Sequence, residues 1–466
     1  MTISASQTGH SNTATISGQT RRLAGYMASA LQAPLPEEAV DRGTLHILDT
    51  LAAIISGSRL LPGRKAIEYV TQTGGRGECL VLGSDRLATP LDAALANGMC
   101  GHADETDDSH APTALHPGCI VLPAALAAGE HWQRSGTDLL RATALGYDLV
   151  VRFSLALGAY KFHGEGHCVP GMAGVFGAGA AAAALGGLDA DAMRHVLSYC
   201  AQQASGLSSW RRDADHIEKA FVFGGMPARN GIAAATMVAS GMTGVEDVFF
   251  GAPTFLGTHS SIGGTSDMLI DGLGETFEIA RTNIKKWCVG SPVQAPLDGV
   301  QTLMRDSGLR YENIERMRIH LPTLATTIVD KTTMADLDVR YLVGVLLLDG
   351  DLSFEAAHDH ARMGEARIAA LRSRIDVIPS DELEALRPER QSIVEIDTTD
   401  GRTLTHRTYA VRGTQKNLMT RAEVEAKSEG LLAPILGKDR TASLIATIRE
   451  IGRVENVRSL RPLLVA

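Results

Sequence analysis

The sequence predicts a mainly α-helical protein in which a smaller α+β lid domain is inserted into a large all-helical domain. Apolar residues repeat at helical spacing from about residue 23 to residue 250. Alternation with a period of two appears only after residue 275, and helical spacing returns after Gly413. A chain of 466 residues also exceeds one simple core. We therefore assign 21–275 and 412–466 to the helical domain and 276–411 to the lid.

The helical elements are read from periodicity and from small residues. Leu45, Leu48, Ala52 and Ile55 lie on one face of a helix that should end near Gly57. The stretch 177–185 is nearly all alanine, which predicts a central helix that its neighbours approach closely. A glycine-rich phosphate loop at 171–179 is the alternative, but no phosphate-binding motif accompanies it. Further helices are expected at 421–432 and 441–451.

The lid combines strands and helices. Residues 316–321 and 392–396 alternate between apolar and polar side chains, which is typical of half-buried strands. Asp400-Gly401 precedes 403–408 and predicts a hairpin turn. Helices are expected between the strands, at 341–348 and 354–361.

Composition and charge exclude several classes of protein. A net charge of -9 gives no basic surface for nucleic acid. We find neither the apolar run of a membrane span nor that of a signal peptide, and residues 1–20 are polar enough to be disordered. The six cysteines are scattered and form no CxxC pair, so we expect buried free thiols in a reducing compartment. These features predict a cytoplasmic protein.

The densest polar cluster runs from His102 to His110 and is followed by His116. A solvated acidic loop is the simplest interpretation of its four carboxylates. Apolar runs at 93–99 and 120–128 flank the cluster, however, and an acidic, histidine-rich loop between buried helices is a place for proton transfer. A metal-dependent hydrolase is a rival hypothesis, built on Asp107, Asp108, His110 and His116. Their spacing matches no common metal motif, so we expect no metal.

At this cluster the chain resembles the MmgE/PrpD family, whose segment reads approximately HALDFDDTH, then five residues, then HPG. Blocks before and after it resemble the family in the same order, which is more specific than any single block. These blocks are 48–50 with Gly57, 77–83, 93–98, 241–244, and the closing residues Gly413, Asn417, Thr420, Glu423 and Lys427.

The resemblance implies a fold, an activity and partners. The family includes 2-methylcitrate dehydratase, cis-aconitate decarboxylase and iminodisuccinate epimerase, which act on small di- or tricarboxylates. Its fold is a large helical domain with an α+β lid. We therefore expect a cofactor-independent enzyme that moves a proton next to a carboxylate. The resemblance, together with the apolar alanine-rich helices, also predicts a homodimer.

The resemblance further implies which residues form the site. Because a C–H bond next to a carboxylate is weakly acidic, the reaction needs a base and nearby cations. The family's HPTG histidine aligns near Cys168, so His163 and His167 both remain possible, and we assign His167. The implied catalytic residues are His116, Lys219, His167 and Tyr341, and the implied substrate-binding residues are Asp107, Asp108, Ser109, Lys285 and Arg340.

Departures from the family pattern bear on the substrate. Glu105 stands where the family has aspartate, Ser109 where it has threonine, Asp338 where it has serine and Arg340 where it has proline. Arg340 could bind a carboxylate, and Asp338 or Glu105 could meet an amine. These departures favour epimerisation of iminodisuccinate, with dehydration of a 2-methylcitrate-like acid as the alternative. A non-catalytic carboxylate-binding protein is a further hypothesis.

Overall fold

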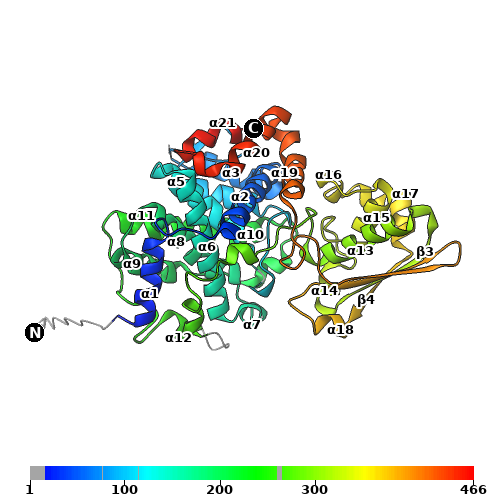
Figure 1. Cartoon of the computed structure of the whole chain (residues 1–466), viewed down its shortest axis with the longest axis horizontal. Helices are drawn as coiled ribbons and strands as arrows, with labels where there is room; N and C mark the ends of the chain where they lie inside the picture. The colour runs from blue at the N-terminus through cyan, green and yellow to red at the C-terminus, as the bar shows by residue number, and fades with distance from the viewer. Residues whose placement is uncertain (1–15, 76, 114, 260–264) are drawn as a thin grey trace, which may run out of the picture.

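The computed structural model describes residues 16–75, 77–113, 115–259 and 265–466. A large helical domain lies beside a smaller α+β domain (Figure 1), which confirms the predicted fold class. Buried apolar side chains form one core from residues 23–288 and 431–464 and another from residues 287–396. Since the second core draws on one continuous stretch, we propose that 276–411 is an inserted domain.

The core of the helical domain draws on two separate segments of the chain, residues 23–288 and 431–464. A two-stranded hairpin, β1 (Cys79–Leu80) with β2 (Leu87–Ala88), joins its third and fourth helices. The helices are α1 (Gly18–Ser29), α2 (Glu37–Gly57), α3 (Leu61–Thr73), α4 (Pro90–Gly101), α5 (Pro117–His131), α6 (Gly136–Leu157), α7 (Ala159–Gly164), α8 (Val169–Leu185), α9 (Ala190–Gln203), α10 (Ile217–Ala220), α11 (Met226–Ala239), α12 (Phe255–His259), α19 (Arg421–Leu436), α20 (Lys438–Arg449) and α21 (Arg461–Leu464).

Helix α8 lies at the centre of this domain, as its alanine content predicts. Every residue of α8 is buried. Small side chains let α6 approach it, because a Cβ added at Gly177 would lie 2.6 Å from the carbonyl oxygen of Gly146. The segment 171–179 is therefore the interior of a buried helix, and the phosphate-loop alternative is wrong.

The first helix starts earlier than expected. Of the predicted disordered segment 1–20, residues 1–15 lie outside the described part of the chain. Gly18 begins α1, and the Ser17 hydroxyl accepts a hydrogen bond from the backbone N–H of Thr20 at 3.1 Å. The Asp247 carboxylate accepts from the backbone N–H of Ser17 at 2.9 Å, so this start is fixed to the helical domain.

The α+β domain contains a four-stranded sheet in the order β4-β3-β5-β6. Strand β4 runs parallel to β3, and the other pairs are antiparallel. Gly401, with a φ of 84°, turns the predicted hairpin between β5 and β6. The elements are α13 (Ser291–Ser307), β3 (Ile314–Pro322), α14 (Thr323–Val329), α15 (Val339–Asp349), α16 (Phe354–Ala357), α17 (Ala366–Arg372), β4 (Ile375–Ser380), α18 (Asp381–Glu384), β5 (Ser392–Thr398) and β6 (Thr403–Thr408).

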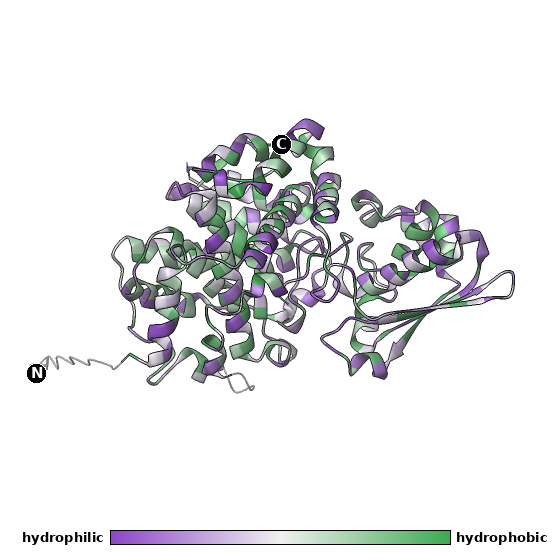
Figure 2. Ribbon diagram, in the orientation of Figure 1, coloured by the Kyte–Doolittle hydropathy of each residue, from purple (hydrophilic) through white to green (hydrophobic). Residues whose placement is uncertain are grey.

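Two features of the α+β domain differ from the prediction. Helix α16 ends at Ala357, whereas helical spacing suggested an end at residue 361. Strand β4 was not predicted, because most of its residues are partly exposed and show no alternation. Figure 2 shows polar and apolar residues mixed along most helices. Within the described ranges, none of the helices has the length and hydropathy needed to cross a membrane.

A close backbone contact gives a test of the packing around the helix that leads into the acidic cluster. A Cβ at Gly98 of α4 would lie 2.6 Å from the carbonyl oxygen of Gly224. We expect Gly98→Ala to lower the free energy of unfolding by about 1–3 kcal/mol, because backbone cannot move aside as a side chain can. The measurement is urea denaturation followed by circular dichroism.

The control for this test is Gly25→Ala. Gly25 lies inside α1, and no described atom beyond its helical neighbours comes within 4 Å of the position that a Cβ would take there. This change should stabilise the protein by roughly 0.5–1 kcal/mol, because alanine loses less backbone entropy than glycine in a helix. Equal stability of Gly98→Ala and the wild type would contradict the close contact.

Candidate active site

The candidate site is built on the loop between α4 and α5, which carries the acidic cluster. Helices α4 and α5 are buried along almost their whole length, and they hold the loop between them. The residues from His102 to His110 are all buried, with at most 6% of any polar residue exposed. The solvated acidic loop is therefore wrong, and each buried carboxylate needs a partner.

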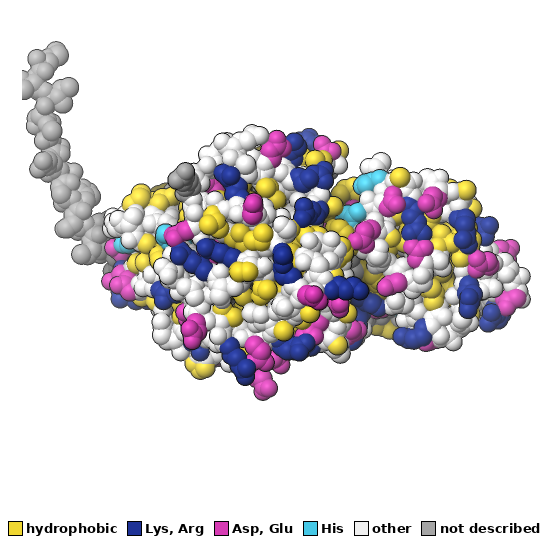
Figure 3. All heavy atoms as spheres, turned by 90° about the horizontal axis from the view of Figure 1, so that it is seen from above, with side chains coloured by type: hydrophobic (Ala, Val, Ile, Leu, Met, Phe, Trp, Pro, Cys, Tyr) yellow, Lys and Arg dark blue, Asp and Glu magenta, His cyan; other side chains and the backbone are white. Residues whose placement is uncertain are grey.

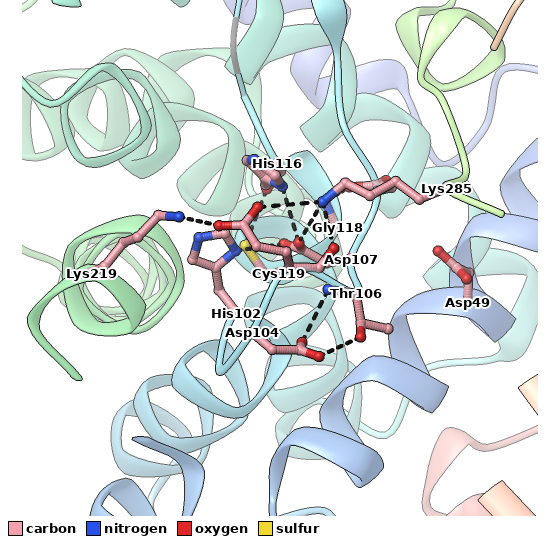
Figure 4. A network of polar contacts seen from close by, with 12 residues as sticks. Asp49, His102, Asp104, Thr106, Asp107, His116, Gly118, Cys119, Lys219 and Lys285 are labelled. Carbon is pink, nitrogen blue, oxygen red and sulfur yellow. Dashed lines mark hydrogen bonds and ion pairs between the residues drawn. The ribbon is translucent and has the colours of Figure 1, made fainter. Parts of the chain in front are cut away.

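Asp107 joins two histidines at the centre of the cluster (Figure 4). One carboxylate oxygen lies 2.9 Å from Nδ1 of His102 and the other 3.0 Å from Nδ1 of His116. Burial disfavours the charged form of Asp107 and so raises its pKa. The interactions with His116 and His102 have the larger effect and hold this pKa well below the ordinary value. Because His116 uses Nδ1 for Asp107, its Nε2 is left for a reacting group.

His116 itself favours the neutral form. Burial lowers its pKa below the ordinary 6.5, and the charge of Lys285 acts in the same direction, while Asp107 opposes both. His116 precedes Pro117, the first residue of α5, so it is fixed where the loop meets the helix.

Two lysines reach Glu105 from distant parts of the chain. Lys219 of α10 forms an ion pair with one carboxylate oxygen of Glu105, and Nζ of Lys285 lies 3.6 Å from the other. Lys285 also donates to the backbone carbonyl of Glu105 at 2.6 Å and lies 3.7 Å from Asp107. Burial alone would raise the pKa of Glu105. The positive charges of Lys219 and Lys285 have the larger effect and hold this pKa well below the ordinary value. The structure thus brings together His116, Asp107 and both predicted lysines, with Glu105 between the lysines.

Asp108 and Ser109 hold the loop in place. Asp108 accepts hydrogen bonds from the Tyr147 hydroxyl at 2.6 Å and the backbone N–H of Gly118 at 2.9 Å, and it lies 2.9 Å from Nδ1 of His46. Both of its oxygens thus face protein donors, and the role in substrate binding stays a prediction. The backbone of Ser109 pairs with Asn283 at 2.9 Å in both directions, which positions Lys285 two residues later.

The α+β domain contributes two residues that the sequence did not indicate. Nε2 of His358 lies 2.9 Å from a carboxylate oxygen of Asp104. Burial opposes protonation of His358, but Asp104 and Asp336 raise its pKa to about 9. Burial raises the pKa of Asp336 to about 6, and the negative charges of Glu105 and Asp104 add to this shift. Neither residue lies in a recognisable sequence motif. They come close to the acidic loop only because the α+β domain packs against the helical domain.

Two residues predicted for the site lie elsewhere. The Tyr341 hydroxyl donates to the carbonyls of Ala356 at 2.6 Å and Asp359 at 3.1 Å, within the α+β domain. Nε of Arg340 donates to Asp330 at 2.6 Å, and its Nη1 donates to the carbonyl of Ile375. The structure therefore does not bring Tyr341 and Arg340 to the acidic loop, because both side chains tie elements of the α+β domain together.

The histidine alternatives differ in their surroundings. His167 stacks on Phe162, with ring centroids 4.1 Å apart. The ring of His163 lies 5.7 Å from that of Trp210, which Lys219 also contacts at 5.3 Å from the ring centroid. Burial and the charges of Arg211 and Lys219 lower the pKa of His163 to about 4. Of the two, His163 is thus the one that shares surroundings with Lys219.

A further histidine was missed by the sequence analysis. His216 is buried, and its ring centroid lies 5.4 Å from that of His102. It has a φ of 61°, which is unusual for a residue other than glycine and is often found at functional sites. Burial and Lys219 lower its pKa well below the ordinary value. No spacing in the sequence indicates it, since it depends on a local backbone conformation.

The geometry also bears on metal binding. Among the described residues, two groups place one ligand atom each within 4.8 Å of the others: His102, Glu105 and His216, and His102, Asp107 and His116. Glu105 already holds two ammonium groups, and Asp107 holds two imidazoles, so either group would have to exchange partners to bind a metal. The set predicted for a hydrolase is not assembled, because Asp108 has its own partners and His110 faces Thr113 and Glu278.

Comparisons with known proteins agree with this architecture. The model of the MmgE/PrpD N-terminal domain matches residues 21–263, and that of the MmgE/PrpD C-terminal domain matches residues 287–451. A cis-aconitate decarboxylase from Aspergillus terreus is 26% identical over 363 residues, which cover 72% of each chain. A cis-aconitate decarboxylase-like protein from Aspergillus oryzae is 27% identical over 336 residues, covering 65% of this chain and 66% of the relative.

The contact between His358 and Asp104 predicts a pH-dependent stability. The folded pKa of about 9 lies above the ordinary 6.5, so this stabilisation should be complete below pH 6.5 and lost as the pH rises through 9. Between pH 6 and pH 10, we expect the wild type to lose on the order of 3 kcal/mol more than His358→Gln. The measurement is urea unfolding at both pH values.

The control is His360→Gln, which removes an exposed histidine two residues away. It should keep the pH dependence of the wild type, because the groups that titrate elsewhere are unchanged. The same pH dependence in His358→Gln and the wild type would show that Asp104 does not stabilise the protonated imidazole.

Proposed function

The chain belongs to the MmgE/PrpD family, and from that premise we propose that it is a lyase that breaks a bond next to a carboxylate of a small tricarboxylic acid. The observation that carries this proposal is one arrangement of buried groups. His116, oriented by Asp107, lies in the same cluster as Lys219 and Lys285. An imidazole next to one buried and one partly buried cation suits reactions in which negative charge develops on carbon beside a carboxylate.

Each group has a role in this chemistry. Lys219 and Lys285 neutralise carboxylates of the substrate and the charge that develops at its reacting carbon. Glu105 keeps the two lysines together, since a buried ammonium group without a counterion is costly. Asp107 fixes the tautomer of His116, so that Nε2 faces the reacting carbon as the group that gives or takes the proton.

Decarboxylation of a cis-aconitate-like acid is the first candidate, because the relatives described above carry that name. The bond from carbon to the departing carboxylate breaks, and its electron pair forms a new double bond. The electrons of the existing double bond move to the carbon beside another carboxylate, and that carbon takes a proton from His116. Carbon dioxide leaves, and the lysines stabilise the charge between these steps.

Dehydration of a 2-methylcitrate-like acid is the second candidate, and the acid–base state of His116 favours it. Because the pKa of His116 lies below the ordinary 6.5, its neutral form predominates at neutral pH and can accept a proton. His116 would remove a proton next to a carboxylate, and the electron pair would form a double bond as the C–O bond breaks. The leaving hydroxide would take the proton that His116 has gained and depart as water, which restores the neutral imidazole. Lys219 and Lys285 would stabilise the negative charge that develops on carbon when this proton is removed.

Epimerisation of iminodisuccinate, which the departures in the sequence favoured, has less support. The argument for a nitrogen-bearing substrate used Arg340, Asp338 and Glu105. Arg340 pairs with Asp330, and Asp338 caps α15 and pairs with Arg372 at 2.7 Å. Glu105 pairs with two lysines. Since all three have protein partners, they give no specific reason to expect an amine.

Incubation with cis-aconitate tests the first candidate directly. We expect carbon dioxide and a five-carbon dicarboxylate as products, and proton NMR would measure the formation of the dicarboxylate. His116→Ala should lower kcat by roughly 100- to 10,000-fold, because it removes the proton donor. His131→Ala is the matched control, since His131 lies at the surface beside Glu78, and it should keep wild-type activity. Formation of an unsaturated product from 2-methylcitrate, without reaction of cis-aconitate, would favour dehydration instead.

The direction of the pH dependence separates the two candidates. Decarboxylation uses protonated His116, so kcat/KM should fall as the pH rises through a pKa below 6.5. Dehydration uses the neutral form, so kcat/KM should fall as the pH decreases through the same pKa. We expect the first profile, with the best activity on the acidic side of neutrality. Deuterium exchange at an α-carbon of iminodisuccinate in heavy water, with neither lyase activity, would instead support epimerisation.

A further inference from the structure

A cavity lies next to the acidic cluster, between the two domains. Its volume is about 440 Å³, large enough for a six-carbon acid with its hydrating water. Ser109 lines it from the helical domain, Ser291 and Arg390 line it from the α+β domain, and Lys285 lines it from the segment where the two cores meet. Lys285 therefore belongs both to the cavity and to the cluster around Glu105 and Asp107.

Two donors that line this cavity have no partner within the described part of the protein. They are the hydroxyl of Ser291 and Nη1 of Arg390, and both atoms are buried. Ser291, with 8% of its surface exposed, is the first residue of α13, a helix of 17 residues. A buried donor without an acceptor costs about 1–3 kcal/mol, and more when it is charged. Both donors and the positive end of α13 would be satisfied by an anion.

The charges around the cavity also favour an anion with several negative groups. Figure 3 shows Lys and Arg side chains, with Asp and Glu among them, on both sides of the junction between the domains. The acidic residues that line the cavity are Glu278 and Glu389, of which Glu389 pairs with Lys416 at 2.5 Å. The basic residues that line it are Arg281, Lys285, Arg390, Arg412 and Lys416.

We propose that this cavity binds the carboxylates of the substrate that are remote from the reacting carbon, with Arg390 and Ser291 as specificity-determining contacts. The inference rests on the proposed function, because Lys285 is what connects the cavity to His116 and Lys219. Arg390 offers a planar fork for a carboxylate, and Ser291 adds a hydroxyl donor at a helix N-terminus. The enzyme thus prefers acids with carboxylates at both ends over monocarboxylates.

Calorimetric titration with tricarballylate, a saturated tricarboxylate that cannot undergo either reaction, tests this proposal. Arg390→Ala should weaken its binding by roughly 10- to 100-fold, because a charge-assisted contact is lost. Ser291→Ala should weaken binding to a smaller degree. Because this change removes only one hydroxyl group, the fold should stay intact. The control is Arg402→Ala, an exposed arginine of the β5–β6 hairpin that pairs with Asp400, and it should bind as the wild type does. On the true substrate, Arg390→Ala should raise KM more than it lowers kcat.

The outcomes separate this proposal from the proposed function. Absence of tricarballylate binding to the wild type, or equal affinity of the wild type, Arg390→Ala and Ser291→Ala, would overturn the cavity assignment. Turnover of a tricarboxylate with an unchanged KM in Arg390→Ala would overturn it while leaving the lyase intact. Binding of tricarballylate that depends on Arg390, without turnover of any acid tested, would support the cavity and count against the lyase.

Discussion

Burial of negative charge is the constraint on which this structure depends. The loop after α4 places Asp104, Glu105, Asp107 and Asp108 inside the protein, where unpaired carboxylates would be unstable. Each has at least one partner distant in the chain, namely His358 for Asp104, Lys219 for Glu105, Lys285 for Asp107 and Tyr147 for Asp108, so the site cannot form before the fold does. Nζ of Lys427, for example, lies 2.7 Å from the buried Asp49 and 3.1 Å from the carbonyl of Thr106, which joins α19, α2 and the loop. The partners of the acidic loop are His46, His102, His116, Tyr147, Lys219, Lys285 and His358.

The same constraint connects the architecture to the chemistry. A set of cations gathered to neutralise buried acids is also a set that can bind a polycarboxylate and stabilise a carbanion. The α+β domain participates through His358 and Asp336, so the contact between the domains also contributes residues to the site. The acidic cluster is the densest polar pattern in the sequence because the loop carries the acids together with His102 and His116, while Lys219 and Lys285 come from elsewhere in the chain.

Much of the fold follows from periodicity, and part of the site follows from composition. The alanine-rich α8, the long α2 and the β5–β6 hairpin were predictable because local patterns determine them. Strand β4 was not, since it is partly exposed and is stabilised by its parallel pairing with β3. His116 and the lysines were predictable through a family resemblance. Asp336 and His358 were not, because only tertiary packing brings them to the loop, and His216 was not, because its position depends on a local backbone conformation.

The departures from the family pattern show that a residue next to a predicted site residue in sequence need not contact the substrate. Arg340 and Asp338 adjoin Tyr341, yet α15 directs all three side chains to partners inside the α+β domain. Glu105 and Ser109 are different, because Glu105 contacts both lysines and Ser109 lines the adjacent cavity. Glutamate is one methylene longer than the family's aspartate, so it moves the carboxylate that sets the position of both ammonium groups. A difference in substrate between this chain and its relatives is therefore to be sought at Glu105 and in the cavity beyond Lys285.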